Sequence, residues 1–300
     1  MKLRVGIFQI DVAIGDVAAN RKKVEHWMET RFVPADLPTA IVVPELWTTG
    51  YRLDKAAELA DEEGKETAEF LGGLAKRYGV WFVGGSTLAS VTSPTGAAGY
   101  ANRGQVVSPD GKLVKNYDKA HLIRLMQEDR YFIAGREPSL FDIRSPDGTG
   151  VRVGNVTCYD IRFCEWLRSY ALDGAEVLFV AAQWPSSRAL HWNALLRARA
   201  IENQMFVVAC NRTGTSDGTA FGGESAVIDP YGELLFKAGE GEEAAFTVIE
   251  TSRASEFRRF LTVFEDRTPE IYTCAQRSRV DAPCMDSETR CAHPFRALRE

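Results

Sequence analysis

Short apolar runs recur along this chain and alternate with segments of helical periodicity, and this alternation limits the possible folds more than any other feature. The apolar runs, which are typical of strands buried on both faces, cover residues 39–45, 80–86, 175–182 and 205–211. Helical segments are expected over residues 18–31, 64–78, 164–173 and 188–203. A chain that alternates in this way is expected to form an α/β fold, with sheets in the middle and helices outside.

Two hairpins are predicted, one in each half of the chain. Each is centred on a Pro-X-Gly turn, in which proline presets φ and glycine tolerates a positive φ; the turns are Pro109-Asp110-Gly111 and Pro230-Tyr231-Gly232. This repetition suggests two mixed sheets with weak internal two-fold character. No linker rich in Gly, Ser or Pro divides the chain, so we expect a single domain over residues 1–265. Periodicity fades after about residue 262, and residues 266–300 are expected to form an irregular tail.

Composition excludes several classes of protein. The net charge is −5 and no long Lys/Arg run occurs, which argues against nucleic-acid binding. No uninterrupted apolar run approaches the length of about 18 residues that a membrane-spanning helix needs. The apolar start of the chain is interrupted by Gln9 and Asp11 and is interpreted as a strand rather than a signal sequence. Six cysteines in 300 residues do not make a disulfide scaffold, so a reducing cytoplasm is the expected compartment.

The stretch NVTCYDIRFCEWLR, residues 155–168, begins like a strand and ends like a helix, with Cys158 at the junction. A side chain on such an elbow lies at the carboxyl end of a sheet, where open α/β sheets bind ligands. The N–H groups of the following helix are expected to favour a thiolate and to hold an oxyanion. The alternative is a buried structural cysteine, since free cysteines are often buried.

Two further stretches support a catalytic thiol. Residues 41–51, IVVPELWTTGY, end an apolar strand at Glu45; an unpaired buried carboxylate there would have the raised pKa that a general base near neutral pH requires. The alternative is a glutamate at the rim of a loop. Lys119, in YDKAHL, follows the first hairpin, where most lysines are solvated surface charges. A cysteine nucleophile, a glutamate base and a lysine cation suffice for acyl transfer without histidine.

In this order and spacing, VPELWTTGY, YDKAHL and CYDIRFCEWLR resemble the signatures of the nitrilase superfamily of carbon–nitrogen hydrolases, and the resemblance runs from about residue 3 to about residue 265. It implies a four-layer α-β-β-α sandwich that is usually at least dimeric through the face of the elbow helix. Residues 181–214 are most similar to the omega-amidase branch, which hydrolyses terminal amides of 2-oxo acids. The resemblance implies neither a metal nor a cofactor.

The same resemblance implies a role for each matching residue. Cys158 would be the nucleophile, Glu45 the general base and Lys119 the cation beside the oxyanion. Glu128, in MQEDRYFIAG, is expected to orient Lys119 and the substrate amide. The backbone N–H of Tyr159 is expected to complete the oxyanion site.

Residues near these motifs are candidates for substrate binding. Gln183, Trp184 and Arg188 follow a central strand, where a pocket wall is expected, and Arg188 could clamp a substrate carboxylate or lie on the surface. Tyr51 and Trp47 follow Glu45 and are candidates for a second wall, with core packing as the alternative.

Two more expectations concern the elbow. Arg162 and Glu165 are expected to form a structural ion pair beneath it. Cys164 stands where relatives usually have proline; because proline at a first helical position is only a conformational preference, little functional effect is expected beyond a second oxidisable thiol.

The predicted function is hydrolysis of a small primary amide, such as the omega-amide of a 2-oxo dicarboxylic acid, through a cysteine thioester. Alternatives are an N-carbamoyl amine or amino acid amidohydrolase, an aliphatic amidase or nitrilase, a Cys-His hydrolase that uses His121, and a catalytically silent binding scaffold. Cys274, Cys284, Cys291 and His293 match no zinc-site spacing. The expected partners are a small amide and a second copy of the chain, with neither nucleic acid nor membrane.

Overall fold

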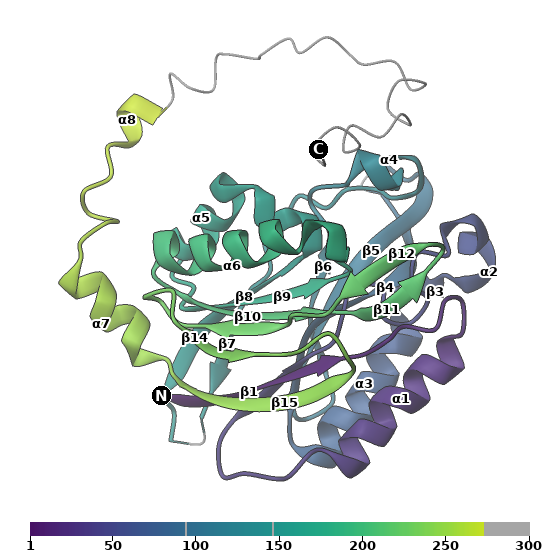
Figure 1. Cartoon of the computed structure of the whole chain (residues 1–300), viewed down its shortest axis with the longest axis horizontal. Helices are drawn as coiled ribbons and strands as arrows, with labels where there is room; N and C mark the ends of the chain where they lie inside the picture. Colours follow the sequence, from purple (N-terminus) through teal and green to yellow (C-terminus); the bar gives the residue numbers. More distant parts are fainter. Residues whose placement is uncertain (94, 146, 273–300) are drawn as a thin grey trace, which may run out of the picture.

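A computed structural model of the chain describes residues 1–93, 95–145 and 147–272. Two large mixed sheets form its centre (Figure 1). The first sheet has the strand order β15-β1-β2-β4-β5-β6, with β3 beside β4. Its strands are β1 (Lys2–Gln9), β2 (Thr39–Val42), β3 (Asp61–Glu62), β4 (Trp81–Thr92), β5 (Ala98–Val107), β6 (Leu113–Asp118) and β15 (Glu243–Glu250).

The second sheet has the order β14-β13-β10-β9-β8-β7. Its strands are β7 (Leu140–Arg144), β8 (Gly150–Thr157), β9 (Val177–Ala182), β10 (Phe206–Asn211), β13 (Ala226–Ile228) and β14 (Leu234–Lys237). In each sheet three central strands run parallel, and antiparallel strands flank them. Both predicted hairpins are present, as β5–β6 and β13–β14. The two sheets therefore repeat one arrangement, as the two-fold character of the sequence indicated.

Helices cover the outer face of each sheet, so the predicted four-layer α-β-β-α sandwich is confirmed (Figure 1). α1 (Val17–Thr30) and α3 (Lys65–Tyr78) pack on the first sheet, and α5 (Cys164–Leu172) and α6 (Ala189–Asn203) pack on the second. The core between the sheets consists mainly of small β-branched and aromatic side chains such as Val5, Val83 and Phe179. Burial of this apolar surface is the main driving force that holds the sheets face to face.

The remaining elements are short and lie at the ends or edges of the sandwich. They are η1 (Leu53–Lys55), α2 (Ala56–Leu59), η2 (Arg124–Met126), α4 (Glu128–Tyr131), η3 (Cys158–Arg162), η4 (Ser186–Arg188), β11 (Thr213–Ser216), β12 (Thr219–Gly222), α7 (Ser252–Phe260) and α8 (Pro269–Tyr272). The sequence did not predict β15, because most of its side chains are only half-buried and form no continuous apolar run. It also treated residues 269–272 as irregular, where the structure has a helical turn.

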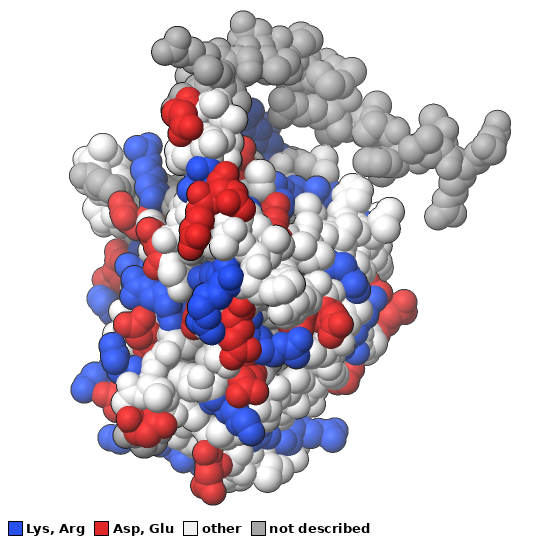
Figure 2. All heavy atoms as spheres, turned by 90° about the vertical axis from the view of Figure 1, so that its left-hand side faces the viewer, with Lys and Arg blue, Asp and Glu red and all other residues white. Residues whose placement is uncertain are grey.

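The surface and termini bear on three other expectations. On the face in Figure 2, acidic and basic side chains are interspersed and form no basic band. Among the described residues, no helix is both long and apolar enough to cross a bilayer. Residues 273–300, which include most of the predicted tail and its Cys and His residues, lie outside the described residues.

Candidate active site

Cys158 lies where β8 ends, with a left-handed backbone φ of +48°. The turn is held by a capping box in which Thr157 and Asp160 bind each other's backbone N–H groups, with 3.0 Å from Thr157 N to Asp160 Oδ2. Asp160 also accepts a hydrogen bond of 2.7 Å from the Tyr117 hydroxyl. The element behind Cys158 is the 3₁₀ turn η3 rather than the long helix itself, since α5 begins only at Cys164. The elbow is confirmed, but one helical turn separates it from the predicted helix.

Glu45 lies three residues beyond β2, in a loop that a bulge in β4 accommodates. The β4–β5 register shifts between Val83 and Ser86, and Gly85 has a positive φ there; a Cβ on Gly85 would lie 2.2 Å from Val43. Ser86 binds this loop through two hydrogen bonds. Its hydroxyl oxygen accepts from the Leu46 N–H over 2.7 Å, and its backbone N–H donates to the Pro44 carbonyl over 3.2 Å. Leu46 has a φ of +41°, a conformation that only well-determined surroundings maintain in a leucine. The strand bulge therefore shapes the backbone that carries Glu45.

Lys119 joins two glutamates inside the protein. Its Nζ lies 2.7 Å from Glu45 Oε1 and 2.8 Å from Glu128 Oε1, and all three side chains are fully buried. Asn102 adds a hydrogen bond of 2.8 Å to Glu45 Oε1 and accepts one from the Lys119 backbone N–H. Glu45 is thus a paired carboxylate, and the sequence-based picture of an unpaired one is wrong. The alternatives of a rim glutamate and a solvated lysine are excluded by the same burial.

The protonation preferences follow from this cluster. Burial raises the pKa of Glu128 above its ordinary value, although the Lys119 charge opposes the shift. Burial acts to lower the pKa of Lys119, but the charges of Glu128 and Glu45 outweigh it and hold this pKa well above its usual range. Lys119 therefore remains a cation at any physiological pH.

The thiol of Cys158 is buried beside the same cluster. Burial, followed by the negative charge of Glu45, raises its pKa well above the ordinary value, and the Lys119 cation offsets only part of the shift. A side-chain hydrogen bond to Glu45 acts in the same direction. The expectation that the N–H groups behind Cys158 favour a thiolate is therefore wrong: burial and the Glu45 carboxylate outweigh the N–H groups of a short turn, and the protonated thiol is favoured.

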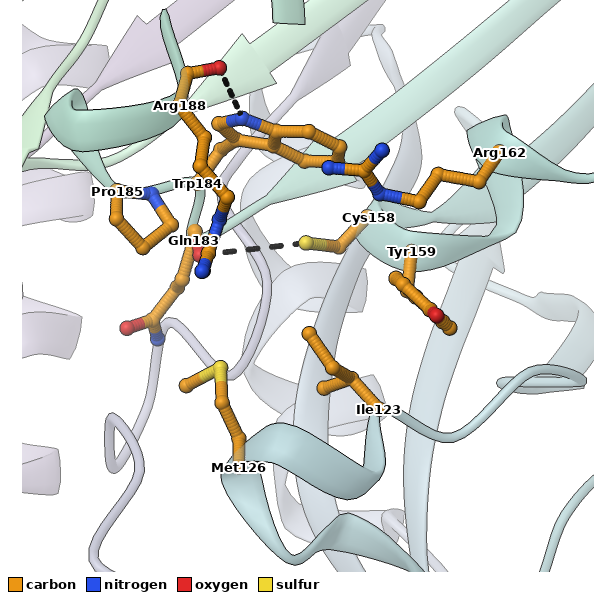
Figure 3. Close-up of a pocket in the computed structure, with 9 residues that line it drawn as sticks. All are labelled: Ile123, Met126, Cys158, Tyr159, Arg162, Gln183, Trp184, Pro185 and Arg188. Carbon is orange, nitrogen blue, oxygen red and sulfur yellow. Dashed lines mark hydrogen bonds between the residues drawn. The ribbon is translucent and has the colours of Figure 1, made fainter. Parts of the chain in front are cut away.

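A pocket opens over Cys158 (Figure 3). Of the predicted wall residues, Gln183, Trp184 and Arg188 line it, and the Trp184 indole N–H donates to the Arg188 carbonyl over 2.8 Å. The remaining lining residues are Ile123, Met126, Tyr159, Arg162 and Pro185. The role of these side chains in substrate binding remains a prediction.

Tyr51 and Trp47 do not line this pocket. The Tyr51 hydroxyl donates to Glu128 Oε1 over 2.7 Å, so this residue supports the buried cluster instead. Trp47 is fully buried in the core near Phe70, which is the packing alternative.

Arg162 faces the pocket, and its side-chain contacts in the described residues are with Tyr159, Trp184 and His191 rather than with Glu165 as expected. Its guanidinium lies 4.7 Å over the Trp184 ring and donates to His191 Nδ1 over 3.2 Å. Glu165 instead accepts from the thiol of Cys164. The short 3₁₀ turn redirects residue 162 toward Cys158, which helical spacing from residue 164 onward did not predict.

The Cys-His alternative receives no support from the geometry, and the tail residues considered for zinc lie outside the described residues. His121 Nδ1 lies 2.8 Å from Asp160 Oδ1 and its ring stacks on Phe163 at 3.7 Å, so its contacts are with the elbow and not with the thiol. Within residues 1–93, 95–145 and 147–272, no group of His, Cys, Asp and Glu is suited to hold a metal ion.

Comparison with known proteins agrees with the fold. The family model described as carbon-nitrogen hydrolase matches residues 4–259. A 2-oxoglutaramate amidase of Bacillus subtilis is 40% identical over 272 residues, which are 91% of this chain and 100% of that protein. Omega-amidase YafV of Yersinia enterocolitica is 35% identical over 268 residues, 88% of this chain and 96% of that protein. A CN-hydrolase superfamily protein from Xanthomonas campestris, solved with an arsenic adduct in its active site, superposes with a TM-score of 0.77 at 29% identity and covers 89% of this chain and 98% of its own.

Proposed function

This chain belongs to the carbon-nitrogen hydrolase family, the nitrilase superfamily, and we propose that it is an omega-amidase that hydrolyses the terminal amide of a 2-oxo dicarboxylic acid to the acid and ammonia. The observation that carries the proposal is the buried cluster of Glu45, Lys119 and Cys158 beneath a pocket. Relatives of 34–40% identity named 2-oxoglutaramate amidase support the same substrate class.

The proposed reaction begins with attack of Cys158 Sγ on the amide carbon. Because the pKa of this thiol is raised by burial and by Glu45, the proton must pass to Glu45 as the C–S bond forms. Glu45 then gives that proton to the leaving nitrogen, which departs as ammonia and leaves a thioester. Water, which Glu45 deprotonates, attacks the thioester and releases the acid and the thiol.

The negative oxygen that forms in each step requires fixed donors. Lys119 stays protonated and its ammonium is held by two carboxylates, so it is ready to bind the oxyanion without reorganisation. The backbone N–H of Tyr159, the residue after the nucleophile, is the proposed second donor. Glu128 is the proposed positioning residue for Lys119 and for the substrate amide.

Two arginines favour a substrate that carries a carboxylate. Neither Arg162 nor Arg188, both of which line the pocket, forms an ion pair in the described part of the chain. Burial lowers the pKa of Arg162, and the nearby Arg188 charge contributes to this shift. Two neighbouring cations are best neutralised by an anionic ligand, and guanidinium groups bind carboxylates in a bidentate manner. An N-carbamoyl amino acid also carries a carboxylate and is the second candidate; neutral aliphatic amides and nitriles fit less well.

The test is ammonia release from a panel of four substrate classes: omega-amides of 2-oxo acids, N-carbamoyl amino acids, aliphatic amides and nitriles. The omega-amides should give the highest kcat/KM. Cys158→Ala should lower turnover by about 10⁴-fold or more, as loss of a catalytic nucleophile does in comparable sites. Turnover of no member of the panel would instead favour a silent binding scaffold.

Three accompanying proposals concern the whole chain. Residues 1–265 form the catalytic domain, so truncation after residue 265 should retain activity; Phe264 is packed against the core of the second sheet. The chain forms a homodimer through the face of α5 and α6, where Leu172, Leu190 and Ile201 are exposed, and light scattering would test its mass. A buried catalytic thiol suits a reducing cytoplasm, which is the proposed compartment.

A further inference from the structure

Arg212 is a fully buried charge next to, but outside, the cluster of Glu45, Lys119 and Cys158. It follows β10 directly, and its Nη2 lies 2.8 Å from Asp11 Oδ1 and 3.1 Å from the Val12 carbonyl oxygen. Its Nε donates to the Thr213 carbonyl over 3.0 Å. Burial of a guanidinium is costly even when it is paired, so a protein gains little stability from this arrangement. A buried charge of this kind invites a functional explanation.

The remaining donor of Arg212 points toward the site. Nη1 lies 3.2 Å from the side-chain oxygen Oε1 of Gln183. The other end of the same amide, Nε2, donates to the main-chain carbonyl of Glu45 over 2.7 Å. Only the amide oxygen can accept from a guanidinium and only the amide nitrogen can donate to a carbonyl, so the two contacts dictate the orientation of Gln183. Both ends of the amide are therefore engaged within the protein.

Gln183 makes a second contact with the same glutamate. Its backbone N–H donates to Glu45 Oε2 over 3.0 Å, while Lys119 and Asn102 bind the other oxygen, Oε1. In Figure 3 the side-chain amide of Gln183 points away from Cys158, and its main-chain carbonyl faces the sulfur, at 4.0 Å. Gln183 thus lines the pocket with its backbone and uses its side chain to hold Glu45.

These contacts cross the interface between the sheets. Glu45 follows β2 in the first sheet, whereas Gln183 follows β9, Arg212 follows β10 and Cys158 follows β8 in the second. Glu45 therefore needs an anchor in the second sheet if it is to keep its position relative to the sulfur. Lys119 and Asn102 belong to the first sheet and cannot provide that anchor.

We propose that Arg212 is a positioning residue for the reaction, which fixes the Gln183 amide so that Gln183 holds Glu45 in reach of Cys158. The proposal rests on the role of Glu45 as general base proposed above. Arg212 contacts neither the pocket nor the reacting atoms, so its loss should lower kcat and leave KM nearly unchanged.

A double-mutant cycle tests the connection. Arg212→Met and Gln183→Met should each lower kcat by about 10- to 100-fold, the usual cost of a misplaced catalytic group. The kcat of the double variant should be only slightly lower than that of the less active single variant, because both changes break one chain of contacts. Losses that multiply in the double variant, or a wild-type kcat in folded Gln183→Met, would overturn the proposal.

Matched controls separate positioning from general destabilisation. Arg258→Met removes a half-buried arginine that binds the carbonyls of Ala175 and Asn203, at the ends of β9 and β10 opposite to Gln183 and Arg212. Gln204→Met removes a fully buried glutamine that binds the Leu261 carbonyl over 2.8 Å. Both should lower the melting temperature and keep kcat within about twofold of wild type, the range expected of surroundings without a catalytic contact. If the two control variants lower kcat as much as Arg212→Met and Gln183→Met do, the effect is one of stability and the proposal fails.

A second measurement does not depend on amide turnover. The rate at which methyl methanethiosulfonate, a reagent without an amide, modifies Cys158 is followed against pH by peptide mass spectrometry. In Arg212→Met and Gln183→Met the pH at the midpoint of Cys158 modification should be lower than in wild type and closer to that of Glu45→Gln. The reason is that a displaced Glu45 carboxylate raises the thiol pKa less. An unchanged midpoint in both variants would contradict the positioning role of Arg212. If wild type hydrolyses no amide, the proposed function fails, but the midpoint of Cys158 modification still tests this positioning role. If Arg212→Met does not fold, Gln183→Met alone provides the test.

Discussion

The ammonium group of Lys119 lies 2.7 Å from a carboxylate oxygen of Glu45, although 74 positions separate the two residues and neither side chain reaches solvent. Glu128 binds the same ammonium from the opposite end of a short loop. One cation thus serves two buried anions, and the site keeps a negative balance next to a neutral thiol. Burial, together with the charge of Glu45, raises the pKa of the thiol, whereas the two carboxylates outweigh burial and keep the lysine charged.

Replacement of Lys119 should damage stability as well as catalysis. Lys119→Met leaves Glu45 and Glu128 buried without their cation, and loss of one partner from a buried ion pair costs about 3–5 kcal/mol. The free energy of unfolding, measured in urea, should fall by this amount, and turnover should fall by about 10²- to 10³-fold or more. Lys65→Met, which removes an exposed ion pair with Glu62, should change the free energy of unfolding by less than about 1 kcal/mol.

Neutralisation of Glu45 should make Cys158 easier to ionise while it abolishes turnover. The Glu45 charge and its hydrogen bond both raise the pKa of the thiol, so Glu45→Gln should move the midpoint of Cys158 modification to lower pH. Amide hydrolysis should fall by about 10²- to 10⁴-fold because the general base is gone. Peptide mapping after timed modification checks the first result and ammonia release the second. A midpoint that rises in the variant would show that Glu45 does not act on this thiol.

Glu128 predicts a specific dependence of stability on pH. Burial raises its folded pKa above the ordinary value of 4.5, so the folded protein binds this proton more tightly than the unfolded chain does. The stability contribution of the protonated form is therefore lost as pH rises through the raised pKa. Glu128→Gln lacks that loss, and its melting temperature relative to wild type should increase from about pH 4.5 upward. A difference in melting temperature that stays constant or shrinks with pH would refute this sign.

Arg162 should determine the preference for an anionic substrate. Its guanidinium lines the pocket and is held over Trp184, so Arg162→Met should raise KM for a 2-oxo acid omega-amide by about 10- to 100-fold, the value of one or two charged hydrogen bonds. KM for a neutral amide of similar size should change little. Arg188→Met provides the comparison, since Arg188 lines the same pocket. Equal effects on charged and neutral amides would mean that Arg162 shapes the pocket without binding a carboxylate.

Some parts of the site were missed for identifiable reasons. Asn102 lies within β5 and Arg212 directly follows β10, and nothing in the local sequence marks either residue. They become informative only because Glu45 and Gln183 lie beside them. Arg162 was assigned to an ion pair from its closeness to Glu165 in the sequence; the helix begins at Cys164 as expected, but the 3₁₀ turn over residues 158–162 places Arg162 at the pocket.

The sequence by itself determined the layers of the fold and marked the candidate reactive residues. Alternating apolar runs and helical segments specify sheets and helices through local periodicity, and the two Pro-X-Gly turns specify both hairpins. The motifs around Glu45, Lys119 and Cys158 marked the chemistry. Only the tertiary structure decided which of these groups is charged, paired or neutral. Ionisation depends on burial and on contacts between residues of opposite sheets, such as the hydrogen bond between Gln183 and Glu45. These two residues are 138 positions apart, so no local sequence pattern can predict their contact.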